Sequence, residues 1–179
     1  MMNLAKESLF MHQEKPQTIA NSKTLELAKS AIVAALYVAL TVVLAPFSYG
    51  AIQVRIAEMF NFLPLYNKRY IWAVTVGVFI SNLFSQVGPI DLVVGTLSTL
   101  FVLLINVKVT ENMKSMKQKM AVSTIICAVS MFTIAAELTF VAGLPFFYSW
   151  LTIGVGEFIA MAIGSVIIYT IGKKIDLTK

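Results

Sequence analysis

The chain has very little of the chemistry on which soluble enzymes and disulfide-linked proteins depend. It contains one cysteine, Cys127, and one histidine, His12, in 179 residues, so no disulfide within the chain and no cysteine-based metal site can form. Charged residues make up only 13% of the sequence, whereas about a quarter is usual in soluble domains. Apolar residues make up 58%, and the mean hydropathy is +0.82. These values predict an all-α integral membrane protein with no room for a soluble catalytic domain.

Sequence motifs for nucleotide hydrolysis and for peptidase or esterase chemistry are also missing. Gly172-Lys173-Lys174 lacks the following Ser or Thr and the upstream glycine of a phosphate-binding G-x-x-x-x-G-K-[ST] loop. Neither an H-E-x-x-H motif nor a nucleophile elbow occurs. We therefore expect a protein that is not an enzyme and carries no cofactor of its own.

Six apolar segments follow one another along the chain, at about 28–45, 51–66, 69–86, 90–107, 120–143 and 149–171. A helix of about 20 residues spans the hydrocarbon core of a bilayer. We expect six transmembrane helices within a membrane domain at 25–179, after a cytoplasmic tail at 1–24. A short surface helix at Leu25–Lys29 is a further expectation for the end of this tail.

The basic residues predict the orientation of these helices. Thirteen of the fourteen lysines and arginines lie before the first segment or after the second, fourth and sixth segments. Cytoplasmic loops carry such an excess. The short, polar segment 51–66 could instead be re-entrant, but Lys68 and Arg69 would then lie on the wrong face. Six crossings place both termini in the cytoplasm and leave outer loops at 46–52, 85–90 and 142–149.

Isolated charges in the outer half of the predicted bundle are candidates for a ligand site, since charges at membrane depth usually serve a function. These residues are Arg55, Glu58, Asp91, Glu137 and Glu157. We expect Glu137 and Glu157 to lie at matching depths, roughly 10 Å from the outer helix ends at 1.5 Å per residue, with Asp91 nearer the mouth. The whole group predicts a cation-attracting site open to the outside.

Each of these residues also has a plainer interpretation. Arg55 and Glu58 could form only a structural ion pair, since they are three residues apart on a helix. Asp91 could cap the helix that follows Pro89. Glu137 and Glu157 could be buried as neutral acids, although neither has a partner nearby in sequence.

Aromatic and small residues complete the picture. Aromatic residues near the outer turns are typical membrane-interface anchors, and one or two could stack on a planar ligand; they are Tyr49, Phe146, Phe147, Tyr148 and Trp150. Ser81, Asn82 and Gln86 could add polar contacts or bond between helices. Small residues recur every fourth position, which allows close helix packing; the stripes are Ala31, Ala35, Ala39 and Gly156, Ala160, Gly164.

The first span and the loop after it read A-A-L-Y-V-A-L-T-V-V-L-A-P-F-S-Y-G-A-I-Q-V-R-I-A-E at Ala34–Glu58. With this stretch the chain resembles the QueT family of bacterial membrane proteins, and S-Y-G-x-I-Q-V-R-I-x-E at Ser48–Glu58 is the specific part of the match. Further matches are Leu63–Pro64, Ser81–Asn82, G-P-I-D with a following G-T at Gly88–Thr96, and G-V-G-E at Gly154–Glu157. Ala57 stands where we expect the family to carry serine, so a hydroxyl contact there is not carried over.

This resemblance implies a substrate-binding S component of an energy-coupling factor (ECF) importer in the bacterial cell membrane. It implies an S-component-like bundle of six helices that docks on a transmembrane scaffold subunit (EcfT) and two ATP-binding subunits (EcfA and EcfA′), which would use the ATP. It also implies that an A-x-x-x-A stripe on the first helix contacts the scaffold, and Ala31, Ala35 and Ala39 offer two registers. The implied cargo is a queuosine precursor such as 7-aminomethyl-7-deazaguanine, released inside after the S component topples in the membrane.

We take this transport function as our interpretation, with two alternatives. One is an S component for another small cationic heteroaromatic nutrient; the other is a stand-alone cation-coupled carrier. An interaction-only membrane subunit would leave the outer carboxylates without a role. The candidate ligand-binding residues are Glu157, Glu137, Glu58, Arg55, Asp91, Asn82, Gln53, Tyr49 and Trp150.

Overall fold

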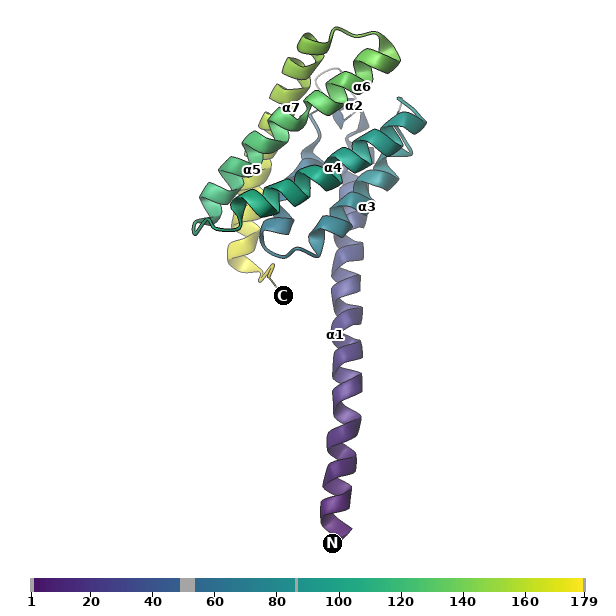
Figure 1. The fold of residues 1–179 in the computed structure, drawn as a ribbon, viewed down its shortest axis with the longest axis vertical. Coiled ribbons are helices and arrows are strands. Elements are labelled where there is room, and N and C mark those ends of the chain that lie inside the picture. The colour runs from purple at the N-terminus through teal and green to yellow at the C-terminus, as the bar shows by residue number, and fades with distance from the viewer. Residues whose placement is uncertain (1, 49–53, 86, 179) are drawn as a thin grey trace.

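The protein is an all-helical bundle with one long helix that extends beyond it (Figure 1). The structure, a computed structural model, describes residues 2–48, 54–85 and 87–178, and no β-strand occurs in these ranges. In chain order the elements are α1 (Met2–Val43), α2 (Ala45–Ser48), the 3-10 helix η1 (Ile56–Leu65), α3 (Tyr70–Asn82), α4 (Pro89–Thr110), α5 (Met116–Ser130), α6 (Phe132–Ala142) and α7 (Phe146–Lys174).

Several of these helices are long and apolar enough to cross a membrane. They are Lys23–Val43 within α1, Pro89–Thr110, Met116–Ala142 and Phe146–Lys174. Their outer surfaces carry exposed large apolar side chains such as Phe101, Phe140 and Val166. In water this surface would be strongly unfavourable, whereas lipid tails accept it. The protein is therefore a multi-pass helical membrane protein.

The first segment differs from the sequence-based expectation at its start. The helix α1 begins at Met2, so the predicted tail at 1–24 and the short surface helix at Leu25–Lys29 belong to one helix that continues to Val43. Figure 1 shows this helix extending well past the bundle at its N-terminal end.

The second segment is a 3-10 helix of 10 residues and not an α-helix. Its bonds join residues three apart, as from the Glu58 N–H to the Arg55 carbonyl at 2.9 Å. Pro64 lies inside it and has no N–H to donate. At about 2.0 Å per residue, η1 is roughly 20 Å long. It contacts α7, α1, α3, α4 and α5, so the most polar of the six segments lies at the centre of the bundle.

The fifth segment is broken at Met131 into α5 and α6. Hydroxyl groups beside the break bond to the backbone: Ser130 Oγ donates to the Cys127 carbonyl at 2.7 Å, and Thr133 Oγ1 donates to the Ser130 carbonyl at 2.9 Å. Side-chain hydroxyls that bond to nearby carbonyls bend helices in this way. The break lies against the central space of the bundle, where its side chains line a cavity.

Glycines allow close contacts between the helices of the bundle. A methyl group on Gly164 of α7 would overlap Met59 Cβ of η1, and one on Gly77 of α3 would lie 2.9 Å from Tyr37 Cβ of α1. The stripe Gly156, Ala160 and Gly164 is buried inside the protein, as its spacing predicts for a packed helix. The stripe Ala31, Ala35 and Ala39 is exposed instead, because Ala34, Tyr37 and Thr41 form the buried face of α1.

Candidate functional site

A cavity lies among η1, α4, α5, α6 and α7. Its empty space is about 870 Å³, counting the part that is open to the outside. Glu58 and Asn61 of η1 line it, together with Arg55, which directly precedes η1. The wall also includes Ser85 and Val87 from the turn after α3, and Asp91, Gly95, Ser98, Thr99 and Val102 from α4. From α5 to α7 it includes Cys127, Ser130, Met131, Thr133, Ile134, Glu137, Leu138, Ile153 and Glu157.

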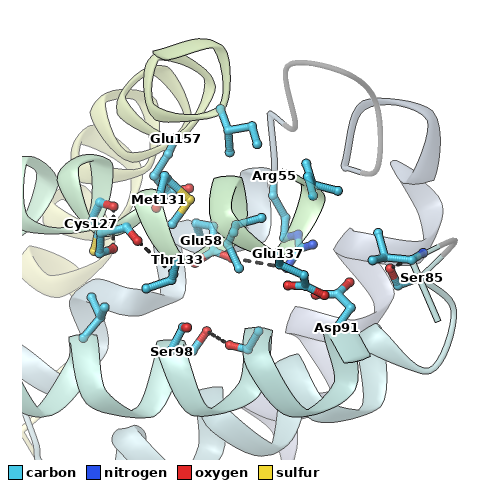
Figure 2. A pocket seen from close by; sticks show the side chains of 18 of the residues that line it. Arg55, Glu58, Ser85, Asp91, Ser98, Cys127, Met131, Thr133, Glu137 and Glu157 are labelled. Carbon is cyan, nitrogen blue, oxygen red and sulfur yellow. Dashed lines mark hydrogen bonds and ion pairs between the residues drawn. The ribbon is translucent and has the colours of Figure 1, made fainter. Parts of the chain in front are cut away.

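The cavity brings together all five charged residues that the sequence singled out. Arg55, Glu58, Asp91, Glu137 and Glu157 come from four separate elements or their edges and line the same space (Figure 2). All four carboxylates are buried. With every group ionised, the wall carries a formal excess of three negative charges from one arginine and four acids. Such an arrangement attracts cations and N–H donors.

Glu58 is the carboxylate whose partners are already in place. Tyr37 Oη donates to Glu58 Oε1 at 2.5 Å, Asn61 Nδ2 donates to Oε2, and Arg55 Nη1 lies 3.6 Å from Oε1. Through Glu58, these contacts connect α1 to η1 and attach Arg55, the residue before η1, to the same helix. The predicted Arg55–Glu58 ion pair is present, and it is part of the structure that supports the cavity wall.

Glu137 and Glu157 are bonded quite differently. Glu137 is 5% exposed and neither of its carboxylate oxygens has a hydrogen-bond partner; Glu157 is 3% exposed and its Oε1 has none. A buried charged group without a partner costs roughly several kcal/mol, unless a proton or a bound ligand neutralises its charge. Both side chains line the cavity, so an entering ligand can supply the missing contact.

The two acids do not lie at the matching depths that we expected. The helix α7 begins at Phe146, directly after Pro145, so Glu157 is eleven residues, roughly 16 Å, along it. Glu137 is five residues, roughly 8 Å, before the end of α6 at Ala142. Figure 1 shows that α6 and α7 meet at the same end of the bundle where α4 begins. Glu157 is therefore the deeper acid, and Glu137 the shallower.

Asp91 lies in the first turn of α4 but does not cap it. Gly88 occupies the N-cap position with a φ of 85°, and no side-chain capping bond is present. Asn82 Nδ2 donates to the backbone carbonyl of Asp91 at 3.0 Å. A methyl group on Gly95 would lie 2.6 Å from Asn82 Nδ2 and 2.7 Å from Asp91 Oδ1, so glycine leaves the room that these side chains occupy.

Two predicted ligand residues do not line the cavity. Asn82 does not line the cavity itself but donates a hydrogen bond to the backbone carbonyl of Asp91, which does. Trp150 donates from its indole Nε1 to the Val129 carbonyl at 3.0 Å and packs edge-on against Phe132. It therefore connects α7 to the break between α5 and α6. Phe147 and Tyr148 are exposed, as expected for interface anchors. Tyr49, Gln53 and Gln86 lie outside the described residues.

Other wall residues were not singled out by the sequence-based reasoning. Gly95, Ser98, Thr99 and Val102 share one face of α4 with Asp91, and this helical spacing could have been found by following the face from Asp91. Cys127 is buried and also lines the cavity. Asn61 follows Glu58 by three residues, a spacing that the sequence shows, whereas Tyr37 supports the wall from another helix and is identified only by its contact with Glu58.

Comparison with known proteins decides the family. The family model described as QueT transporter matches residues 27–173. The chain belongs to the QueT transporter family. A curated QueT relative from Lactococcus lactis subsp. cremoris (strain MG1363), named Queuosine precursor transporter QueT, is 43% identical over 167 residues, covering 88% of this chain and 98% of the relative. No solved structure matches.

Membership of the QueT family makes this chain a transporter and not an enzyme. The geometry agrees with reversible binding of a small molecule, because the wall offers carboxylate hydrogen-bond acceptors around a space. Among the residues with described positions, no group of three or more His, Cys, Asp or Glu side chains is arranged to hold a metal ion.

Proposed function

We propose that this chain is the substrate-binding S component of an ATP-driven ECF importer in a bacterial cell membrane. It binds a queuosine precursor, such as 7-aminomethyl-7-deazaguanine, in the carboxylate-lined cavity while that cavity faces outward. It then delivers the precursor to the cytoplasm together with an energising module of EcfT, EcfA and EcfA′.

The observation that carries this proposal is the set of unpartnered carboxylate oxygens on Glu137 and Glu157 in a buried cavity. The aminomethyl compound has an ammonium group and a guanine-type edge with adjacent N–H donors. Charge-assisted hydrogen bonds to carboxylates are the strong ones, and a carboxylate accepts two parallel N–H groups well. The relative from Lactococcus lactis is named a queuosine precursor transporter, which supports the same class of cargo.

We further propose six crossings with both termini in the cytoplasm. In Figure 1 the α3–α4 and α6–α7 connections lie at one end of the bundle, with α2, while the α4–α5 connection and the C-terminus lie at the other. Lys68, Lys114, Lys173 and Lys174 are exposed at or near that second end. A lysine-rich end is typical of the cytoplasmic side. With this orientation, η1 is part of the second crossing; it has only 10 residues, but a 3-10 helix rises more per residue than an α-helix.

The exposed stripe Ala31, Ala35 and Ala39 supports docking on a scaffold subunit. Its small side chains lie on the outer surface of α1, so another helix could approach closely there. This chain would rely on EcfA and EcfA′ for ATP hydrolysis, since it has no phosphate-binding loop.

Uptake of labelled 7-aminomethyl-7-deazaguanine into cells tests the function. Cells with this chain and the energising module are compared with cells that have this chain alone and cells that have the module alone. We expect uptake only with both. Uptake with this chain alone would instead support a stand-alone cation-coupled carrier.

A further inference from the structure

The carboxylates that are available to a ligand form two separate groups in the cavity. Asp91 and Glu137 lie together, and we call them the shallow pair; Glu157 is the deep carboxylate. In Figure 2 the Arg55–Glu58 ion pair lies between them, with Ser85 beyond the shallow pair and with Cys127 and Met131 beside Glu157. The neighbouring charges follow the same division: the acid that acts on Glu137 is Asp91, whereas Glu58 and Arg55 act on Glu157.

The shallow pair lacks enough positive charge. Two carboxylates that face each other in a buried site repel, so one of them takes up a proton unless a cation binds between them. Arg55 interacts with Asp91, but its guanidinium is also paired with Glu58 at 3.6 Å. Glu137 is left with two unpartnered oxygens beside a second acid. A compact ammonium group, which has three N–H donors, supplies both the charge and the hydrogen bonds that this pair lacks.

The deep carboxylate has different surroundings. Glu157 has one unpartnered oxygen and lies next to the Arg55–Glu58 pair, so the negative charge of Glu58 and the positive charge of Arg55 both act on it. Cys127, Met131 and Ile153 contribute polarisable and apolar wall nearby. This end of the cavity suits a flat, uncharged ring that presents N–H groups along one edge, because such a ring gains hydrogen bonds without adding a second buried cation.

Accordingly, we propose that the shallow pair of Asp91 and Glu137 binds the ammonium group of the cargo and that Glu157 binds the N–H edge of its ring. Recognition of the side group and recognition of the ring are then separable functions of different residues. This assignment rests on the function proposed above. It predicts that Glu137 determines the preference for an ammonium-bearing compound over an uncharged analogue of the same ring.

Calorimetric titration of the purified full chain in detergent tests the assignment. The ligands are 7-aminomethyl-7-deazaguanine and 7-cyano-7-deazaguanine, which share the ring but differ in the charge of the side group. The variants are Glu137→Gln and Glu157→Gln, each of which replaces a carboxylate by an uncharged amide of nearly the same size. Asp91→Asn is a second change in the shallow pair, and thermal unfolding without ligand shows that each variant is folded.

We expect Glu137→Gln to weaken binding of the aminomethyl compound roughly ten- to hundredfold, with the cyano compound changed less than about threefold. Asp91→Asn should change the preference in the same direction. Glu157→Gln should weaken both compounds by a similar factor and leave their ratio unchanged.

Other results would overturn the assignment in distinguishable ways. If Glu137→Gln and Asp91→Asn weaken both compounds equally, or if Glu157→Gln alone abolishes the preference, the division between the two groups is wrong. Equal affinity of the unaltered protein for the two compounds would remove the ammonium site but keep the transport function. Binding of neither compound by the folded, unaltered protein would reject the proposed function itself.

Discussion

Glu58 and Glu137 line one cavity and are buried to nearly the same extent, yet their hydrogen bonding is opposite. Glu58 accepts from Tyr37 and Asn61 and pairs with Arg55, whereas neither oxygen of Glu137 has a partner. Glu157 resembles Glu137, with one oxygen unpartnered. Burial alone therefore does not distinguish a supporting acid from a ligand-binding one. The partners of each carboxylate do.

The difference has an energetic consequence. The contacts of Glu58 are made in the empty protein, so they contribute to folding. The contacts that Glu137 and Glu157 lack can be made only when something enters the cavity, so they contribute to binding. In a transporter this division is useful, because a site that already satisfies its own charges has little free energy left with which to attract its cargo.

The largest expected effect is on stability, at Glu58. Replacing Glu58 by Gln removes the negative charge from the buried Arg55–Glu58 pair and turns an amide N–H toward one of two donors. Breaking a buried pair by removing one member costs about 3–5 kcal/mol. We expect a clearly lower thermal unfolding midpoint for the ligand-free protein in detergent, with Glu137→Gln unchanged or higher as the matched control. Equal midpoints for the two variants would remove the distinction.

The next effect is on binding, at the acids without partners. Glu137→Gln or Glu157→Gln should each cost about 1.5–3 kcal/mol of binding free energy for 7-aminomethyl-7-deazaguanine, because one charge-assisted contact is lost. The measurement is the dissociation constant, with ligand-free stability measured in parallel. A variant that loses stability and retains affinity would show that its acid supports the fold, as Glu58 does.

A third change acts on the supporting side through packing. Gly164→Ala places a methyl group where it overlaps Met59 Cβ and pushes η1, with Glu58, away from α7. Overpacking of this kind costs about 1–3 kcal/mol. We expect a lower unfolding midpoint and weaker binding together. Gly154→Ala, whose methyl group would lie 3.2 Å from the Ala128 carbonyl, is the control and should have the smaller effect on both.

A fourth change acts on the ligand-binding side through the break between α5 and α6. Trp150→Phe keeps an aromatic ring against Phe132 but removes the indole N–H that donates to the Val129 carbonyl. One such hydrogen bond is worth about 0.5–1.5 kcal/mol. We expect a modest fall in stability and a loss of affinity, since α6 carries Glu137. Unchanged affinity would mean that the break does not position this acid.

The smallest effect on the isolated protein is expected at the exposed stripe of α1. Ala35→Leu should leave ligand binding and the unfolding midpoint unchanged, because Ala35 faces away from the bundle. It should reduce uptake in cells that contain the energising module, since a larger side chain holds the partner helix away. Ala162→Leu, at an exposed position of α7, is the control; an equal loss of uptake there would contradict docking through α1.

Much of the cavity could be predicted because a charged side chain in an apolar membrane segment is costly and seldom occurs there without a function. Arg55, Glu58, Asp91, Glu137 and Glu157 were chosen from sequence and all five line one space. The Arg55–Glu58 ion pair was among the interpretations of the sequence, but the hydrogen bond to Glu58 from Tyr37 on another helix could not be predicted from it. The same holds for the hydrogen bond from Trp150 to the Val129 carbonyl, because these residues are 21 positions apart.

The local shape of the backbone was harder to predict from the sequence, because it also depends on contacts between residues that are far apart in the chain. The pattern of 51–66 indicates an apolar segment, but the 3-10 form of η1 accompanies its close contact with Gly164, which lies about a hundred residues later in the chain. The early start of α7 at Phe146 also moved Glu157 deeper than its position in the apolar segment suggested.

The most direct test of the account is thermal unfolding of the purified, unaltered protein with and without 7-aminomethyl-7-deazaguanine, with the cyano analogue in parallel. A ligand that binds only the native state raises the midpoint, and the rise grows with the logarithm of the ligand concentration divided by its dissociation constant. We predict a large rise with the aminomethyl compound and a small one with the cyano compound. No rise with either compound in folded protein would contradict the claim that the unpartnered carboxylates bind this cargo.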